Sequence, residues 1–221
     1  MFVKQQGLSL IEILVTIAIG VFLLGGASSL GLFTINNTYA INHKATLQQE
    51  MDNILNLISN DIARAGFSTN NFQRIWLNDQ IGTSGNFKCI IYRYDRNSNS
   101  AVDADETRGI YFNVDTTNAK NNEIRILRNS DLASTNNCSD AIWSDNDKAP
   151  VIHNKQSITI NSLNLKPHIT NLTNSNIPAN TVDSVEISLT ATQTGRLSST
   201  SDDQQLTITR TVQLRNLPIK Q

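Results

Sequence analysis

The sequence predicts an α+β protein in which a long N-terminal α-helix packs on an antiparallel β-sheet head, and three observations lead to this class. Between residues 8 and 35 the only charged side chain is that of Glu12. From Leu47 to Ile62 apolar residues recur at spacings of three and four, as in an amphipathic helix. After Phe67, short apolar runs alternate with polar turns, which is typical of strands. The expected parts are a leader at 1–7, a transmembrane helix at 8–35, an amphipathic helix at 36–66 and an extracytoplasmic head at 67–221.

The apolar run at 8–35 is long enough to cross about 30 Å of hydrocarbon at a rise of about 1.5 Å per residue. Lys4 precedes it, which places the N-terminus in the cytoplasm and the head outside. Two simpler interpretations are a secretory signal cleaved near residues 25–27 and a plain single-span anchor. Neither explains Glu12, because a carboxylate at the bilayer centre costs roughly 2.5–3.5 kcal/mol.

Residues 7–12, which read Gly-Leu-Ser-Leu-Ile-Glu, resemble the prepilin motif of type IV pilins and type II secretion pseudopilins. The resemblance implies that a prepilin peptidase cleaves after Gly7 and methylates the new N-terminal Leu8, where phenylalanine is more usual. It also implies that Glu12, the fifth residue of the mature chain, neutralises the N-terminal ammonium of a neighbouring subunit during assembly. Such an ion pair satisfies two charges that are each costly to bury alone.

The helix is expected to continue through the polar residues at 36–38 and to end near Ala65 and Gly66, because glycine is the usual left-handed residue after a helix. Its apolar stripe is expected to pack under the sheet of the head. The residues of this stripe are Leu47, Met51, Ile54, Leu55, Ile58 and Ile62.

Six strands are predicted in the head, and two of them show clear alternation of apolar and polar residues. These two, at 184–192 and 206–214, are expected to be antiparallel hairpin partners across a mobile polar loop at 193–205. The other four are predicted at 87–94, 107–114, 123–127 and 157–165. Strand order does not follow from periodicity.

The chain has two cysteines, Cys89 and Cys138. An even number in an exported domain favours one disulfide, and two separate buried thiols are the alternative. Closing a loop of about 50 residues would stabilise the head by roughly 3–4 kcal/mol in the chain-entropy model. A disulfide implies an oxidising compartment such as a periplasm.

Residues 95–106 align with the twelve-position calcium loop. Ser100 stands where the sharp turn of that loop wants glycine, and strands rather than helices flank it, so a solvated hairpin loop is the alternative. No cofactor is required by the sequence, and calcium is the one metal it suggests. The ligands would be Asp95, Asn97, Asn99, the carbonyl of Ala101, Asp103 and Glu106.

The sequence argues against an enzyme. His43, His153 and His168 are not at metal-ligand spacing, and neither a G-x-S-x-G motif nor a phosphate-binding glycine loop is present. The cysteines do not form a C-x-x-C motif. The net charge is −1 and no basic block occurs, which argues against direct binding of nucleic acid.

Three further stretches, at 61–67, 89–95 and 210–216, resemble the PilW-like minor pilins. This resemblance implies a subunit that co-assembles with other minor pilins and the major pilin to prime or cap a type IV pilus, which then serves adhesion, twitching motility or DNA uptake. It implies processing by prepilin peptidase and contact with inner membrane platform proteins. The chain would be an inner membrane single-pass protein with a periplasmic head before assembly, and would lie in the extracellular pilus afterwards.

Two alternatives stay open. Minor pseudopilins of the J type share the pattern at the helix end and the last strand, so a type II secretion pseudopilus is the nearest competitor. A membrane-anchored binding module or adhesin is the second, and it predicts that replacing Glu12 has little effect on function.

Overall fold

The computed structural model describes residues 9–67, 75–80, 87–99, 103, 106–128, 141–170, 181–193 and 205–214. The chain divides into two compact units, Met1–Ala45 and Thr46–Gln221, which are considered separately below. Helix α1 (Leu10–Ile62) supplies the described residues of the first unit, apart from Ser9, and the first element of the second unit.

The head has seven strands in the residues that the structure describes, all paired antiparallel. They are β1 (Ile75–Gln80), β2 (Phe87–Arg93), β3 (Thr107–Asn113), β4 (Glu123–Leu127), β5 (Ile158–Thr170), β6 (Thr181–Gln193) and β7 (Leu206–Gln213). Two short 3₁₀ helices, η2 (Ala119–Asn121) and η3 (Ala141–Ser144), lie between strands.

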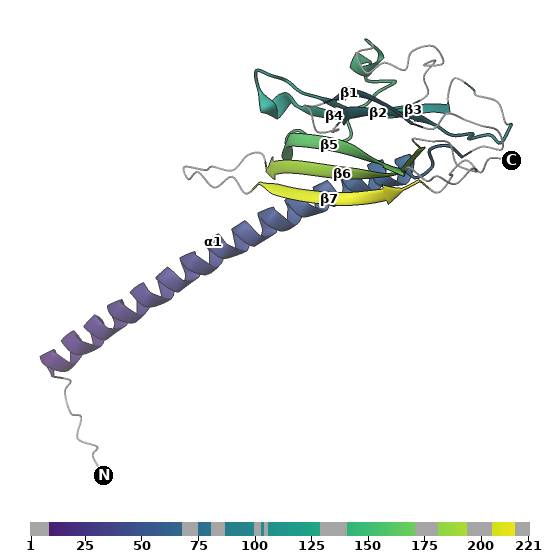
Figure 1. Cartoon of the computed structure of the whole chain (residues 1–221). Helices are drawn as coiled ribbons and strands as arrows, with labels where there is room; N and C mark the ends of the chain where they lie inside the picture. Colours follow the sequence, from purple (N-terminus) through teal and green to yellow (C-terminus); the bar gives the residue numbers. More distant parts are fainter. Residues whose placement is uncertain are drawn as a thin grey trace. The chain divides into compact units, whose positions relative to one another are not determined.

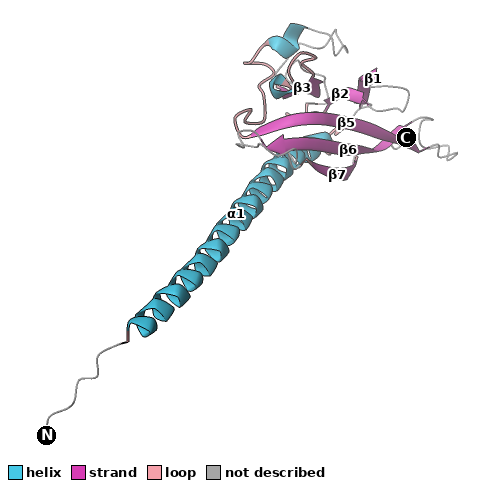
Figure 2. Cartoon of the chain, turned by 90° about the vertical axis from the view of Figure 1, so that its left-hand side faces the viewer, coloured by secondary structure: helices cyan, strands magenta, loops and turns pink. Residues whose placement is uncertain are grey.

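The strands fall into two groups that form separate layers in both views (Figures 1 and 2). In the first group β2 pairs with β1 and β3, and β3 pairs with β4. In the second group β6 pairs with both β5 and β7. A single residue pair, Phe87 with Leu165, joins β2 to β5. The two groups of strands therefore form one sheet, and a single residue pair joins them. Periodicity alone could not predict this junction.

All six predicted strands are confirmed, and so is the β6–β7 hairpin pairing. The loop between these two strands lies mostly outside the described residues, so its expected mobility stays a prediction. Strand β1 was not predicted. Strand β5 runs to Thr170 rather than ending at Leu165, and so includes His168, which lies beyond the predicted end of the strand. Pro167 fits there because β5 pairs with β2 only at Leu165, so the missing N–H of the proline interrupts no second ladder.

The predicted helix stripe forms the centre of the main core. All six of its residues are buried against apolar side chains from β2 to β7. The C-terminal part of α1 lies against β6 and β7 in both views (Figures 1 and 2), and Arg210 of β7 donates to Asp52 Oδ1 at 2.8 Å and to Asn56 Oδ1 at 2.5 Å. This part of α1 is therefore stabilised as a helix by burial of the stripe rather than by helix propensity.

Helix α1 ends at Ile62, earlier than predicted, and a turn at 63–66 leads to the predicted terminator, Gly66. Gly66 has a φ of 76°, a left-handed conformation that side chains with a Cβ disfavour, and its N–H donates to the carbonyl of Arg93 at 2.8 Å. The chain is thereby tied to the end of β2 as it leaves the helix.

The outer edge of β4 is covered by the chain itself. The N–H of Ile126 donates to the carbonyl of Pro150 at 3.2 Å, and that of Ile152 to the carbonyl of Ile124 at 3.0 Å. Arg125 Nη1 also donates to the carbonyl of Ala149 at 2.9 Å. Covering an edge strand in this way satisfies backbone groups that would otherwise attract another chain.

Strand β2 is buried on both faces, which explains its continuous apolar run. Ile90 and Tyr92 point into the main core, whereas Cys89 and Ile91 belong to a smaller cluster on the opposite face. That cluster also contains Leu127, Trp143 and Ala149. Trp143 packs directly over Gly109 of β3, where a Cβ would lie 2.8 Å from the indole and 3.0 Å from the carbonyl oxygen of Ile90.

Replacing Gly109 by alanine is therefore expected to lower the free energy of unfolding by about 1–3 kcal/mol through overpacking. Urea unfolding of the detergent-solubilised full chain measures this loss. In the double variant Gly109→Ala/Trp143→Leu the clash with the indole is removed and only the contact with the Ile90 carbonyl oxygen remains, so the loss due to Gly109→Ala should shrink in the Trp143→Leu background. An equal loss in both backgrounds would show that the indole is not the obstacle.

Candidate processing and assembly site

The candidate site lies at the start of α1. Gly7 and Leu8, the predicted processing residues, lie outside the described residues, so the cleavage position stays a prediction. Glu12 lies in the first turn of the helix with its side chain exposed, and its N–H donates to the carbonyl of Ser9 at 3.0 Å. A carboxylate in this turn is favoured by the helix dipole.

Beyond Glu12, the helix presents large apolar side chains to its surroundings. Leu14, Phe22, Leu30 and Ile41 are all more than 60% exposed. By length and composition the helix could cross a membrane, with a mean hydropathy of 2.4 over its best 18-residue window and none of that window buried. An apolar surface of this extent needs lipid or other helices to cover it.

Four hydroxyl groups on this helix have a hydrogen-bond acceptor within it. Those of Thr16, Ser29, Thr34 and Thr38 each donate to a carbonyl three or four residues earlier, at 2.8–2.9 Å. Glu12 is the only charged side chain between residues 9 and 42. The arrangement therefore isolates one carboxylate on an apolar helix, where a cation from another chain would be its natural counter-ion.

The structure describes four predicted calcium ligands in addition to Glu106, and hydrogen bonds within the loop join three of these four, Asn97, Asn99 and Asp103. Asp103 Oδ2 accepts from the amide nitrogens of Asn97 and Asn99, both at 2.7 Å. The fourth, Asp95, is buried.

Glu106 is also buried, and its two carboxylate oxygens accept backbone N–H groups across the loop. Those of Arg96 and Asp103 donate at 2.8 and 3.0 Å. Among the described residues no group of three or more His, Cys, Asp and Glu is arranged to hold a metal ion, and Ala101 lies outside them. In this arrangement Glu106 closes the loop through protein hydrogen bonds, and calcium binding stays a prediction.

Cys89 is fully buried in β2, within the smaller cluster beside Trp143. Its predicted partner, Cys138, lies outside the described residues. The pairing of the two is taken up below as a proposal.

Sequence reasoning missed a buried polar cluster at the end of α1. The hydroxyl of Tyr92 donates to Asp61 Oδ2 at 2.5 Å, and Arg108 Nε lies 4.0 Å from the same oxygen. Arg108 Nε also donates to the hydroxyl of Tyr94 at 3.2 Å. Burial, followed by the charge and hydrogen bond of Asp61, raises the pKa of Tyr92 well above its usual value. The cluster ties α1 to β2 and β3.

A signal for this cluster was present in the sequence. Asp61 follows Ile54 and Ile58 at spacings of seven and three, so it lies beside the apolar stripe rather than opposite it. A carboxylate so close to a buried face requires a hydrogen-bond partner. The partner could not be named, because it comes from strands whose order is not written in the periodicity.

Comparison with family models gives two matches. The model of the prokaryotic N-terminal methylation motif matches residues 3–28, and so covers Gly7, Leu8 and Glu12. The model of prepilin peptidase-dependent protein B matches residues 40–214, which is well over half of the chain. Searches of curated proteins and of solved structures found no match. The two family matches agree with the exposed apolar helix and the α+β head, and the chain belongs to the prepilin peptidase-dependent protein B family.

Proposed function

We propose that the protein is a PilW-like minor pilin that co-assembles with other minor pilins and the major pilin to prime or cap a type IV pilus. It is cleaved after Gly7 by prepilin peptidase and methylated on Leu8, and it meets the inner membrane platform proteins before assembly. Its head lies in the periplasm and then in the extracellular pilus. Its role is structural, without catalysis.

One observation carries this proposal: a single exposed carboxylate, Glu12, lies on the membrane-length part of α1, which is exposed, apolar and otherwise uncharged. A simple anchor gains nothing from Glu12. A filament of such helices gives the carboxylate a partner, the N-terminal ammonium of the next subunit. The methylation motif at 3–28 supports that reading, because cleavage of the chain within such a motif would create this ammonium group.

Replacing Glu12 by alanine is expected to reduce assembly into pili by at least about 100-fold, because removing one partner of a buried pair leaves the other charge uncompensated. The measurement is the amount of this protein in sheared pili, and its co-purification with other pilins from membranes. Resistance to alkaline extraction should be unchanged, since the apolar span is intact.

The matched control is Glu50→Ala, which removes the same kind of side chain from the same helix beyond the apolar run. It should leave assembly near the wild-type level. If Glu12→Ala assembles as well as the control, the filament proposal fails and a membrane-anchored binding module or adhesin is favoured. Co-purification with secretion pseudopilins instead of pilins would place the chain in a type II secretion pseudopilus.

A further inference from the structure

We propose that Tyr39, His43 and Lys44 form an interfacial anchor, which binds the phosphate headgroups of the outer leaflet before the subunit joins a filament. The proposal rests on the proposed membrane insertion of α1 and goes beyond it, because it assigns a lipid-contacting role to residues outside the apolar span. Three observations on the unit Met1–Ala45 carry it.

The first observation is one of length. From Leu10 to Tyr39 the helix rises about 44 Å at about 1.5 Å per residue, and a usual tilt of about 20° reduces this to about 41 Å. A bilayer with its headgroups is about 40–45 Å thick. With Leu10 at the inner surface, Tyr39 therefore reaches the outer headgroups. Three polar residues, Asn36, Asn37 and Thr38, directly precede it.

The second observation is the stacking of two amphipathic rings. Tyr39 and His43 lie one helical turn apart with ring centroids 6.2 Å apart and an interplanar angle of 26°. Tyr39 is 64% exposed. Rings with an apolar body and a polar tip are enriched where hydrocarbon meets water.

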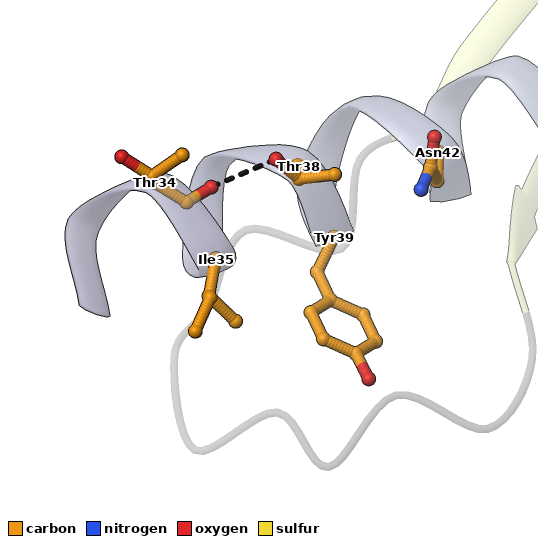
Figure 3. Close-up of a pocket in the computed structure, with 5 residues that line it drawn as sticks. All are labelled: Thr34, Ile35, Thr38, Tyr39 and Asn42. Carbon is orange, nitrogen blue, oxygen red and sulfur yellow. Dashed lines mark hydrogen bonds between the residues drawn. The ribbon is translucent and has the colours of Figure 1, made fainter. Parts of the chain in front are cut away.

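The surroundings of Tyr39 have the same two-sided character. In Figure 3, Ile35 and Tyr39 point to one side of the helix, whereas Thr34, Thr38 and Asn42 lie toward the other. Thr38 Oγ1 donates to the carbonyl of Thr34 at 2.8 Å, so its hydroxyl group is satisfied within the helix. This helical segment thus carries apolar and polar side chains together, at the depth where acyl chains meet headgroups.

The third observation is one of charge. Lys44 is exposed and is the first cation of the chain after the apolar run, with no charged residue between it and Glu12. A lysine at this depth extends its ammonium group toward phosphate, while its methylene stem covers apolar surface. The ring pair sets the depth and Lys44 supplies the counter-charge to the headgroup phosphate. Assembly into a filament must then break this contact.

The test uses the full chain with the background substitution Lys4→Gln, so that the lysine before the apolar run gives no signal, labelled with ¹⁵N at lysine side chains and reconstituted in vesicles of phosphatidylcholine and phosphatidylglycerol. Rotational-echo double-resonance NMR detects contact between lysine Nζ and lipid ³¹P. We expect dephasing of a lysine signal that is lost in Lys44→Gln and retained in the control Lys120→Gln, which removes an exposed lysine of the head. Tyr39→Ala should weaken the dephasing, and Tyr39→Trp should preserve it.

Wild-type protein without this dephasing, or Lys44→Gln with unchanged dephasing, would overturn the anchor. Equal contact with inorganic phosphate in detergent micelles would also overturn it, because the residues would then form a general anion site. Alkaline extraction of the same vesicles separates the two proposals. A chain that washes out contradicts membrane insertion and so the proposed function, whereas an inserted chain without phosphate contact contradicts the anchor alone.

Discussion

Replacing Asp61 by alanine is expected to lower the free energy of unfolding by about 2–3 kcal/mol. The side chain of Asp61 accepts a hydrogen bond from the fully buried Tyr92 and lies next to Arg108. Its removal leaves the tyrosine hydroxyl without an acceptor in the core, and an unsatisfied buried donor costs more than the net value of the bond itself. Urea unfolding of the full chain, followed by circular dichroism of the head, measures this loss.

The matched control is Asp52→Ala, on the same helix. Asp52 also bonds an arginine of a strand, at 2.8 Å from Arg210 Nη2, but both side chains of that pair are about one-third exposed. Solvent screens such a pair, so its loss should cost no more than about 1 kcal/mol. Equal effects of the two substitutions would contradict the role assigned to burial in the Asp61 cluster.

The same cluster predicts a loss of stability in alkali. The pKa of Tyr92 is raised in the folded state by burial first and by Asp61 second. In the unfolded chain a tyrosine releases its proton near pH 10. Above that pH, ionisation of Tyr92 favours the unfolded state over the folded one. The stability linked to Tyr92 is therefore present below about pH 10 and is lost as pH rises toward the folded-state pKa. Tyr92→Phe should remove this part of the pH dependence while leaving the ring packed.

Much of the fold could be predicted from the sequence, because one-dimensional patterns report which side of each element is buried. The apolar stripe from Leu47 to Ile62 was enough to place this part of α1 on the core. The alternation of apolar and polar residues was enough to place β6 and β7 there. The left-handed Gly66 was predicted for the same local reason, since few other residues tolerate that conformation after a helix.

Features that depend on long-range pairing could not be predicted in this way. The junction of β2 with β5 at Phe87 and Leu165, and the bond between Tyr92 and Asp61, join residues that are far apart in sequence. Strand β1 was not predicted because apolar and polar residues alternate only weakly along it. Its pairing with β2, which comes later in the chain, is not visible in the sequence. The candidate site itself was recognised because its motif is local.

Reduction of a Cys89–Cys138 disulfide is expected to lower the free energy of unfolding by about 3–4 kcal/mol, because the closed loop of about 50 residues restricts the unfolded chain. This pairing remains our proposal. It is supported by the absence of a free cysteine among the described residues and by the complete burial of Cys89. The measurement is urea unfolding of the full chain with and without a phosphine reductant.

The control variant is Cys138→Ala, which should unfold at the same urea concentration whether or not reductant is present. Substituting Cys89 instead would confuse the comparison, because its sulfur is packed among Ile91, Leu127 and Trp143 and a replacement would alter that packing. Alkylation of the unreduced, unfolded protein followed by intact-mass analysis counts thiols directly. Two alkylated cysteines, together with no effect of reductant on stability, would establish that the thiols are separate. The chain would then give no disulfide-based reason to place the head in an oxidising compartment.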